Sequence, residues 1–386
     1  MSLSDVAEVV RGVTYQREVA LSNPCEGYIP VLRAGNIQDE LVLNDDLVWL
    51  PAVVVSDRQL LRPNDVLMCT SSGSADVVGK SALFDTEGWS GSFGAFCAVI
   101  RANHKACLPA YLRYVLRAPE FLSWARSSLG ANIKNIRKSE LELFKFHLPS
   151  LSEQLRIAAI LDKAGGLRRK RQEAIRLADD LLSSAFVDMF GAPGSVAPSL
   201  PTQPLGDVCR FYAGNSLPEG EPFVGQLDGV LHIKVGDMNL PGNESVVSTS
   251  REWSANGAGG IVAPKGAILI PKRGGAIATN KKRVLGRPCA LDPNLMAISP
   301  GSGLRQELLF QWFKLFDLST ITSGSAVPQL NKGDLAPLRI VVPPVEQQDR
   351  FAEIAHRVTS IVNRQAIQLG DIESACRALT AELLSA

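Results

Sequence analysis

Apolar and polar positions follow a short, irregular pattern over the first 150 residues. Apolar, β-branched runs recur between turn residues, which is typical of a β-rich fold. These runs lie at 28–32, 47–55, 65–68 and 95–100. Between 108 and 129 the apolar spacing changes to three and four residues, which predicts one or two helices packed on the sheet. The scheme returns later, with strands expected at 229–235 and 267–270 and a helix at 307–316.

Two longer segments have the pattern of amphipathic helices. The first follows Ser152, a residue type that favours the N-cap, and both show the three-four spacing of a coiled-coil seam. The seam positions are Ile157, Ile160, Ala164, Leu167, Ala174, Ala178, Leu181 and Ala185, and then Phe351, Ile354, Val358, Ile361, Ile372, Ala375, Leu379 and Glu382. Because each helix must bury its seam, we expect the two to pair antiparallel. The first, ending at Phe190, would be roughly 55–60 Å long.

The second half of the chain repeats the first. Residues 130–154 align without a gap with 324–348, at an offset of 194, and 33–37 align with 234–238 at an offset of 201. A duplication of this length predicts two similar units in a pseudo-symmetric molecule. The middle of each unit has diverged, as expected of two domains that bind different ligands. Neutral drift of a structural duplication is the alternative.

These patterns predict an α+β fold divided into five segments. The first β-rich unit spans 1–150 and is followed by a helix at 151–191. Pro, Gly and Ser residues at 192–201 indicate a linker. The second β-rich unit spans 202–343, and the last helix spans 344–386.

Composition describes an ordinary globular protein of two domains. Of the 386 residues, 46% are hydrophobic and 20% are charged, and no run approaches the roughly 20 apolar residues of a membrane span. The N-terminus lacks the pattern of a signal peptide, so we expect a cytoplasmic protein. The seven cysteines include no CxxC pair and only four histidines are present, which favours buried reduced thiols over a metal site.

The net charge of +1 does not by itself indicate nucleic-acid binding. Charge is concentrated locally, because residues 271–288 carry six Lys and Arg side chains and no acid, and 134–138 form a second basic cluster. A third cluster, 168–171, falls on the first long helix, where we expect a solvated helix face.

At this point the sequence resembles a known family, the specificity subunits of type I restriction-modification systems. The matching residues are Gly130-Ala131-Asn132-Ile133 and, about twenty residues later, Leu148-Pro149-x-Leu151-Ser152-Glu153-Gln154-x-Arg156-Ile157-Ala158-x-Ile160-Leu161-Asp162. The second copy departs from this pattern, with Gln347 in the place of Glu153. The resemblance covers nearly the whole chain.

The resemblance implies two target recognition domains, each reading one half of a split sequence in double-stranded DNA. The paired helices would set the gap between the halves and dock two adenine-methyltransferase subunits. S-adenosylmethionine, ATP and Mg would belong to partner subunits, and this chain would bind no cofactor of its own. Whether restriction subunits also join is left open.

A search for catalytic motifs gives little. The stretch from Gly73 to Ser81 is one residue too long for the phosphate loop GxxxxGK[ST], and no Asn-Pro-Pro-Tyr or Asp-Pro-Pro-Tyr adenine-methylation motif is present. We therefore expect a non-catalytic protein. Alternatives are a nuclease or methyltransferase with scattered acids, a scaffold whose two modules grip proteins, and an orphan specificity subunit without restriction activity.

Candidate DNA contacts are polar and basic residues of types that bind base edges or phosphates. In the first unit they are Arg33, Asn36, Ser72, Ser74, Lys80, Lys134, Asn135 and Lys138. In the second they are Lys234, Arg273, Asn280, Lys281, Lys282, Arg283, Gln329 and Lys332. Asn36 is as well suited to shaping a turn, and the run 281–283 is expected to contact phosphates. Candidate docking residues on the helices are Ile157, Ile160, Leu167, Leu181, Phe351, Ile354, Val358, Ile361 and Leu379.

Overall fold

The structure is a computed structural model, in which residues 1–74, 76–127, 134–194, 200–255, 261–322 and 328–385 are described. The duplicated stretches 130–133 and 324–327 and part of the expected linker, 195–199, lie outside the described residues, as does the side chain of Lys134.

The chain forms two compact units, and each contains one half of each long helix. Unit 1 comprises Met1–Gln172 and Ile367–Ala386, and unit 2 comprises Glu173–Ala366. The long helices are α5 (Leu151–Phe190) and α10 (Val345–Ser385). The compact units therefore cut across the helices, whereas the expected segments followed the ends of the helices.

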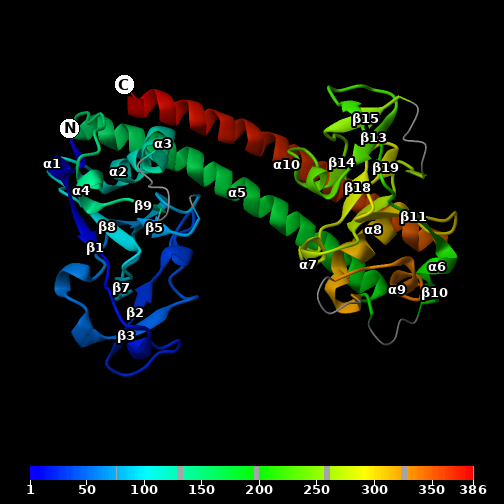
Figure 1. The fold of residues 1–386 in the computed structure, drawn as a ribbon, viewed down its shortest axis with the longest axis horizontal. Helices are drawn as coiled ribbons and strands as arrows, with labels where there is room; N and C mark the ends of the chain where they lie inside the picture. The colour runs from blue at the N-terminus through cyan, green and yellow to red at the C-terminus, as the bar shows by residue number, and fades with distance from the viewer. Residues whose placement is uncertain (75, 128–133, 195–199, 256–260, 323–327, 386) are drawn as a thin grey trace. The chain divides into compact units, whose positions relative to one another are not determined.

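The described part of unit 1 is built on a four-stranded antiparallel sheet (Figure 1). Its order is β1 (Ala7–Arg11), β8 (Cys97–Ala102), β4 (Asp65–Cys69) and β6 (Ser81–Phe84). A smaller sheet has the order β3 (Val48–Pro51), β2 (Tyr28–Leu32) and β7 (Ser92–Phe93). The short helices of this unit are α1 (Leu3–Val6), α2 (Pro109–Val115), α3 (Pro119–Ser127) and α4 (Lys138–Glu142).

Strand β4 is buried on both faces because it lies between two layers. Val66 and Met68 share a core with the helices, including Leu112 of α2. Leu67 shares a second core with Phe93 of the smaller sheet. Successive side chains of a strand point to opposite faces, so a nearly continuous apolar run serves both cores.

Unit 2 repeats this scheme. One sheet has the order β11 (Cys209–Ala213), β20 (Leu295–Pro300), β17 (Ile268–Pro271), β18 (Arg283–Leu285) and β14 (Val246–Val247). The other has the order β12 (Glu221–Pro222), β15 (Glu252–Ser254), β13 (Val230–Ile233), β19 (Cys289–Leu291) and β16 (Val262–Ala263). The remaining elements are β10 (Thr202–Pro204), β21 (Arg339–Val341), α6 (Leu205–Val208), α7 (Gly275–Ala278), α8 (Gln306–Leu315) and α9 (Lys332–Leu335). The order β11–β20–β17–β18 corresponds to β1–β8–β4–β6, which confirms the α+β duplication.

A buried glutamine explains why the repeat is so regular at the start of each long helix. The Gln154 side chain accepts a hydrogen bond from the Leu108 amide at 2.8 Å and donates to the carbonyl oxygens of Ala106 at 3.0 Å and Pro149 at 2.9 Å. Gln348 makes the same three bonds in unit 2, to Arg305, Gly303 and Pro343. Each glutamine therefore ties the start of a long helix to the residues before α2 or α8.

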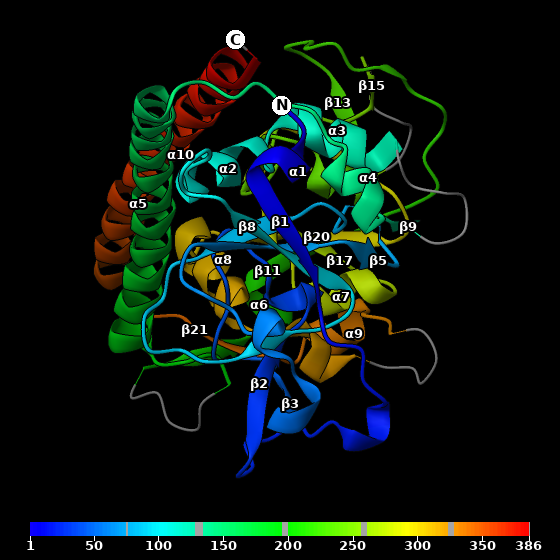
Figure 2. The same ribbon diagram turned by 90° about the vertical axis from the view of Figure 1, so that its left-hand side faces the viewer.

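Opposite ends of the two long helices pack together within each unit. In unit 1, the end of α10 lies beside the start of α5 (Figures 1 and 2), and Leu379, Leu383 and Leu384 of α10 share the core that contains Ile157 and Leu161 of α5. A cluster of three phenylalanine rings fills the corresponding contact in unit 2. Phe351 of α10 lies 5.5 Å from Phe186 and 5.6 Å from Phe190 of α5, between ring centres and in edge-on geometry. The pairing is antiparallel, as predicted.

The predicted seam of α5 fails after the first turns of the helix. Ile157 is buried and Ile160 is half-buried, whereas Leu167 and Leu181 are exposed and Phe186 is buried instead. A heptad count from Ile157 leads to Ala185, but a straight helix of 3.6 residues per turn returns to the same face after about 29 residues, at Phe186. The error therefore comes from applying a seven-residue period to a straight helix.

The seam of α10 is partly confirmed. Phe351 and Val358 are buried, Ile354 and Leu379 are half-buried, and Ile361 is exposed. The start of α5 also differs from expectation, because the helix begins at Leu151 and the Ser150 hydroxyl, rather than that of Ser152, accepts the amide of Glu153 at 3.3 Å. Among the described residues, no helix is both long and apolar enough to cross a membrane.

Candidate nucleic-acid interface

The same backbone pairing forms in both units at a site rich in candidate residues. In unit 1, β5 (Ser71–Ser72) pairs antiparallel with β9 (Lys134–Asn135), and the Ile136 amide donates to the Thr70 carbonyl at 2.8 Å (Figures 1 and 2). In unit 2, Arg273 pairs antiparallel with Gln329, and the Leu330 amide donates to the Lys272 carbonyl at 2.9 Å. We call residues 70–74 with 134–136, and residues 272–274 with 328–330, the paired edges of the two units.

The paired edge of unit 1 carries small polar side chains. Ser72 and Asn135 are half-buried, and Ser74 is exposed with its amide donating to the Ser72 hydroxyl at 3.2 Å. The structure thus brings together Ser72, Ser74 and Asn135, and pairs the backbone of Lys134 with that of Ser72. Four other candidates of this unit are not part of this pairing: Arg33, Asn36, Lys80 and Lys138.

Lys80 and Lys138 of unit 1 lie outside the paired edge. Lys80 is exposed, and its carbonyl accepts the Cys69 amide at 2.9 Å, at the end of the loop that begins in the paired edge. Lys138 is exposed at the start of α4, with its Nζ 3.5 Å from the carboxylate of Glu142. Both ammonium groups remain accessible to a ligand.

The paired edge of unit 2 carries larger groups. Arg273 is exposed, and Gln329 is half-buried with its amide nitrogen donating to the Asn331 side chain at 3.2 Å. Lys332 is exposed at the start of α9, and its Nζ lies 5.8 Å from the centre of the Phe211 ring. The two edges therefore have one backbone arrangement and different side-chain chemistry.

Arg33 and Lys234 occupy equivalent turns that are separate from the paired edges. The Arg33 amide donates to the Asn36 side chain, and the Lys234 amide donates to that of Asp237, each at 2.8 Å. The Arg33 guanidinium is paired with Asp46, and Lys234 Nζ lies 2.6 Å from Glu252. Both basic side chains are partly exposed.

The Asn36 side chain stabilises the turn and is not exposed on the surface. Its side chain is buried, and its amide nitrogen donates to the carbonyl oxygens of Val42 at 3.1 Å and Asp45 at 2.7 Å. This geometry favours the turn-shaping alternative, so we no longer propose Asn36 as a DNA contact.

The basic run 281–283 is not the open cationic loop that we expected. Lys282 is 6% exposed, and its Nζ donates to the Asn280 side chain at 2.5 Å and the Phe316 carbonyl at 2.6 Å. Burial lowers the pKa of Lys282 to about 8. The Asn280 side chain also accepts the Leu318 amide at 3.0 Å. Lys282 and Asn280 therefore join two loops of unit 2. The Lys282 ammonium group is too buried to contact a phosphate.

Lys281 and Arg283, on either side of Lys282, also donate hydrogen bonds within the protein. Lys281 donates to the side chain of Asn239. Arg283 belongs to β18, where its guanidinium donates to the Lys282 carbonyl at 2.9 Å and burial lowers its pKa. The expectation of three phosphate contacts from this run is therefore not retained.

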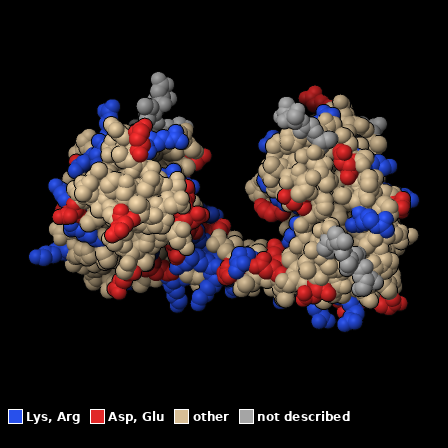
Figure 3. Space-filling view, turned by 90° about the horizontal axis from the view of Figure 1, so that it is seen from below, with Lys and Arg blue, Asp and Glu red and all other residues tan. Residues whose placement is uncertain are grey.

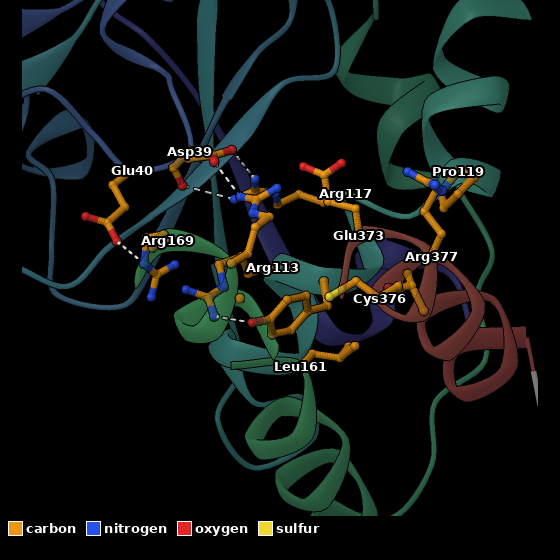
Figure 4. A pocket seen from close by; sticks show the side chains of 14 residues that line it. Asp39, Glu40, Arg113, Arg117, Pro119, Leu161, Arg169, Glu373, Cys376 and Arg377 are labelled. Carbon is orange, nitrogen blue, oxygen red and sulfur yellow. Dashed lines mark hydrogen bonds and ion pairs between the residues drawn. The ribbon is translucent and has the colours of Figure 1, made fainter. Parts of the chain in front are cut away.

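An arginine-rich cavity of about 430 Å³ lies in unit 1 beside α2 and α5 (Figure 4). Arg117 lies 2.9 Å from Asp39, which also pairs with Arg168 of α5, and Arg169 lies 3.5 Å from Glu40. The basic cluster 168–171 is thus only in part the solvated face that we expected. The ion pairs hold the loop of Asp39 and Glu40 against the helix, which is a structural role.

Basic and acidic side chains both occur on the surface of each unit. On the face shown in Figure 3, basic and acidic side chains are interspersed on each unit. Among the described residues, no group of three or more His, Cys, Asp or Glu side chains is placed to hold a metal ion. Five of the seven cysteines are buried, and Cys25 is exposed.

Sequence reasoning missed the structural role of Gln154 and Gln348. Both lie at the aligned position of the repeat, and that alignment was the available signal. The apolar turn residue Phe96, beside the paired edge of unit 1, was also missed.

Comparison with known proteins agrees with this arrangement. The family described as the type I restriction modification DNA specificity domain matches residues 1–177 and again residues 203–369. The specificity subunit of the StySPI type I restriction enzyme of Salmonella potsdam is 39% identical over 161 residues, covering 42% of this chain and 34% of that protein. The specificity subunit of the EcoKI enzyme of Escherichia coli is 37% identical over the same length and coverage. The matched segment thus spans about a third of each relative.

A solved structure shows the same fold along the whole chain. The crystal structure of the S subunit of a type I restriction-modification system from M. genitalium has a TM-score of 0.59 and 13% identity, and it covers 100% of this chain and 95% of its own. Because the family pattern is matched twice, over well more than half of the sequence, the chain belongs to the type I restriction-modification DNA specificity family.

Proposed function

We propose that this chain is a non-catalytic DNA-specificity subunit that recognises a split target, one half with each unit. The observation that carries this proposal is the paired edge, because both units build it from the same backbone hydrogen bonds and give it different side chains. Two domains that recognise different DNA sequences would share the backbone arrangement and differ in the side chains that it presents. The names of the relatives and the family match support the same function.

The side chains of the two edges suit different bases. Arg273 in unit 2 can donate two hydrogen bonds to the O6 and N7 atoms of guanine, and Gln329 can bind adenine through N6 and N7. Ser72, Ser74 and Asn135 in unit 1 offer shorter hydroxyl and amide groups, which bind adenine or act through water. The basic residues Lys80, Lys138 and Lys332 would add phosphate contacts that position each unit.

The long helices would dock two adenine-methyltransferase subunits. Leu167 of α5 in unit 1 and Leu181 of α5 and Ile361 of α10 in unit 2 are exposed, although a soluble helix normally buries such side chains. Exposed apolar residues at these positions fit contact with another protein. Methyl transfer from S-adenosylmethionine would belong to those subunits, and ATP- and Mg-dependent movement on DNA would belong to restriction subunits where these join.

The direct test is to express the chain with its methyltransferase partner and map methylated adenines by sequencing the host genome. The expected result is a split motif with two defined halves and an undefined gap. Arg273→Ala should then lose discrimination at one position of one half, by about 1–3 kcal/mol, and leave the other half unchanged.

Asn280→Ala is a matched control, because Asn280 lies in the same loop region and its side chain is used inside the protein. This variant should retain the motif if it folds, as checked by circular dichroism. A continuous motif, or a change in both halves on replacing Arg273 alone, would contradict the proposal. Methylation by this chain without the partner would show that it is an enzyme instead.

A further inference from the structure

The turn before β8 presents an aromatic side chain to solvent. The Cys97 amide donates to the Gly94 carbonyl at 2.8 Å, which closes a tight turn with Ala95 and Phe96 at its tip. The Phe96 side chain is 69% exposed. Isolated exposed apolar residues are common, so the exposure alone decides nothing.

The position of Phe96 is fixed by the paired edge of unit 1. Its carbonyl oxygen accepts the Thr70 amide at 2.9 Å, the Ser71 amide at 3.1 Å and the Thr70 hydroxyl at 3.2 Å. Thr70 in turn accepts the Ile136 amide from the other half of the edge. The backbone of Phe96 is therefore bonded directly to Thr70 and Ser71 of the paired edge, and Asn135 lies on the other strand of that edge.

The equivalent turn of unit 2 shows that the fold does not need an aromatic residue there. The Leu295 amide donates to the Asp292 carbonyl at 3.1 Å, and the Lys272 amide donates to the Asn294 carbonyl at 2.7 Å. Asn294 thus occupies the position of Phe96, in a turn of Asp, Pro and Asn, which are residues that favour turns. The phenylalanine is specific to unit 1 and contributes little to packing.

A cavity next to Phe96 adds groups that suit a nucleic acid. The cavity has a volume of about 620 Å³ and is lined by Tyr15, Arg17, Arg33 and Phe96 among others. Arg17 is exposed, and the Arg33 guanidinium is partly exposed beside Asp46. Phe96 therefore lines a cavity together with two cationic side chains, and its backbone is bonded to the polar paired edge, in a unit whose proposed ligand is DNA.

We propose that Phe96 contacts the 5-methyl group of a thymine in the first half of the target, and that Arg17 and Arg33 lie along the adjoining phosphates. This inference rests on the proposed function. Thymine is the base whose major-groove edge carries a methyl group, and an apolar side chain is the group that recognises it. The polar residues of the edge would read the neighbouring bases. Unit 2, with Asn294 at this position, would lack the contact.

The test uses the full complex of the chain with its methyltransferase partner and duplexes that carry the mapped target. Each thymine of the first half is replaced in turn by uracil, which lacks the methyl group. For one of these positions, wild-type binding should weaken about fourfold, the value of one buried methyl group. Phe96→Ala should bind the unmodified duplex more weakly and should no longer respond to that replacement.

Two further variants keep the outcome decisive. Phe96→Leu retains an apolar side chain and should keep most of the response to the methyl group. Val53→Ala alters another exposed apolar residue of unit 1 and should leave both binding and response unchanged.

The inference is overturned if Phe96→Ala binds like the wild type, if its uracil response equals that of the wild type, or if the first half contains no thymine. It is also overturned if Phe96→Ala loses the methyltransferase partner in size-exclusion chromatography, because the ring would then contact a protein. Each of these results leaves the split motif of the wild type intact. Absence of a split motif in the wild type would instead refute the proposed function.

Discussion

Replacing Gln348 by Ala tests the physical reason for the most regular part of the repeat. Gln348 is 1% exposed, and its side chain makes three hydrogen bonds of 2.8, 3.0 and 2.9 Å. The substitution leaves the Arg305 amide and the carbonyl oxygens of Gly303 and Pro343 without this partner. Since the amide of Arg305 precedes α8, the contact between α8 and the start of α10 should loosen.

The size of the effect follows from the number of bonds. A net contribution of about 1 kcal/mol for each hydrogen bond gives a loss of about 3 kcal/mol in the free energy of unfolding of unit 2. With a urea slope of about 2 kcal/mol per molar, the midpoint of unfolding should fall by about 1.5 M. Hydrogen exchange measured by mass spectrometry should show faster exchange in the peptide that contains Arg305, while peptides of unit 1 should keep their rates.

The neighbouring Gln347→Ala is the matched control. Gln347 lies on the same helical turn and is not fully buried, so its replacement should cost less than about 0.5 kcal/mol. Gln348→Glu keeps the acceptor for the Arg305 amide and places a carboxylate against two carbonyl oxygens, so it should destabilise at neutral pH. The reasoning is refuted if Gln348→Ala and Gln347→Ala unfold at the same urea concentration.

Three further predictions follow from the structure. The pKa of Lys282 in the folded protein is about 8, below its ordinary value of 10.5, so between these pH values the folded state binds fewer protons than the unfolded state. The stability of the wild type relative to Lys282→Met should therefore rise from pH 8 to pH 10.5. If the two proteins show parallel pH profiles in thermal unfolding, Lys282 is not buried as described. Leu167→Glu and Ile361→Glu should fold normally and fail to assemble with the methyltransferase in size-exclusion chromatography, whereas Leu143→Glu, an exposed leucine after α4, should assemble. Inserting seven residues into each long helix, after Gln172 and after Ala366, adds roughly 10 Å to the helix. The undefined gap of the methylated motif should then lengthen by about three base pairs. An unchanged gap would show that the helices do not set its length.

The fold was predictable from the sequence because the duplication and the apolar periodicities agree. The first long helix was expected at 151–191 and spans Leu151–Phe190. The seam was less predictable, since a heptad pattern and a 3.6-residue turn diverge over eight turns and exchange Leu181 for Leu182 and Ala185 for Phe186. Periodicity identifies a helix over any length, but it gives the buried face only over a few turns.

The candidate site was harder to predict, because residue type does not separate surface groups from buried ones. The amide of Asn36 and the ammonium of Lys282 are groups that also bind DNA, yet both are used inside the protein. Arg273 and Gln329 are far apart in the sequence, and the sequence analysis did not predict that they pair. In the structure Ser71 pairs with Asn135 and Arg273 pairs with Gln329, so the same arrangement forms in both units.

The pattern of ion pairs bears on how a chain of net charge +1 could recognise DNA. Arg117, Arg168 and Arg169 are each paired with an acid of their own unit, so part of the basic charge stabilises loops and is not free to attract phosphates. The accessible groups that remain at the paired edges are few and differ between the units. On the proposed function, this division would give the specificity subunit base contacts with little non-specific attraction for DNA, since the latter depends on the number of phosphates neutralised.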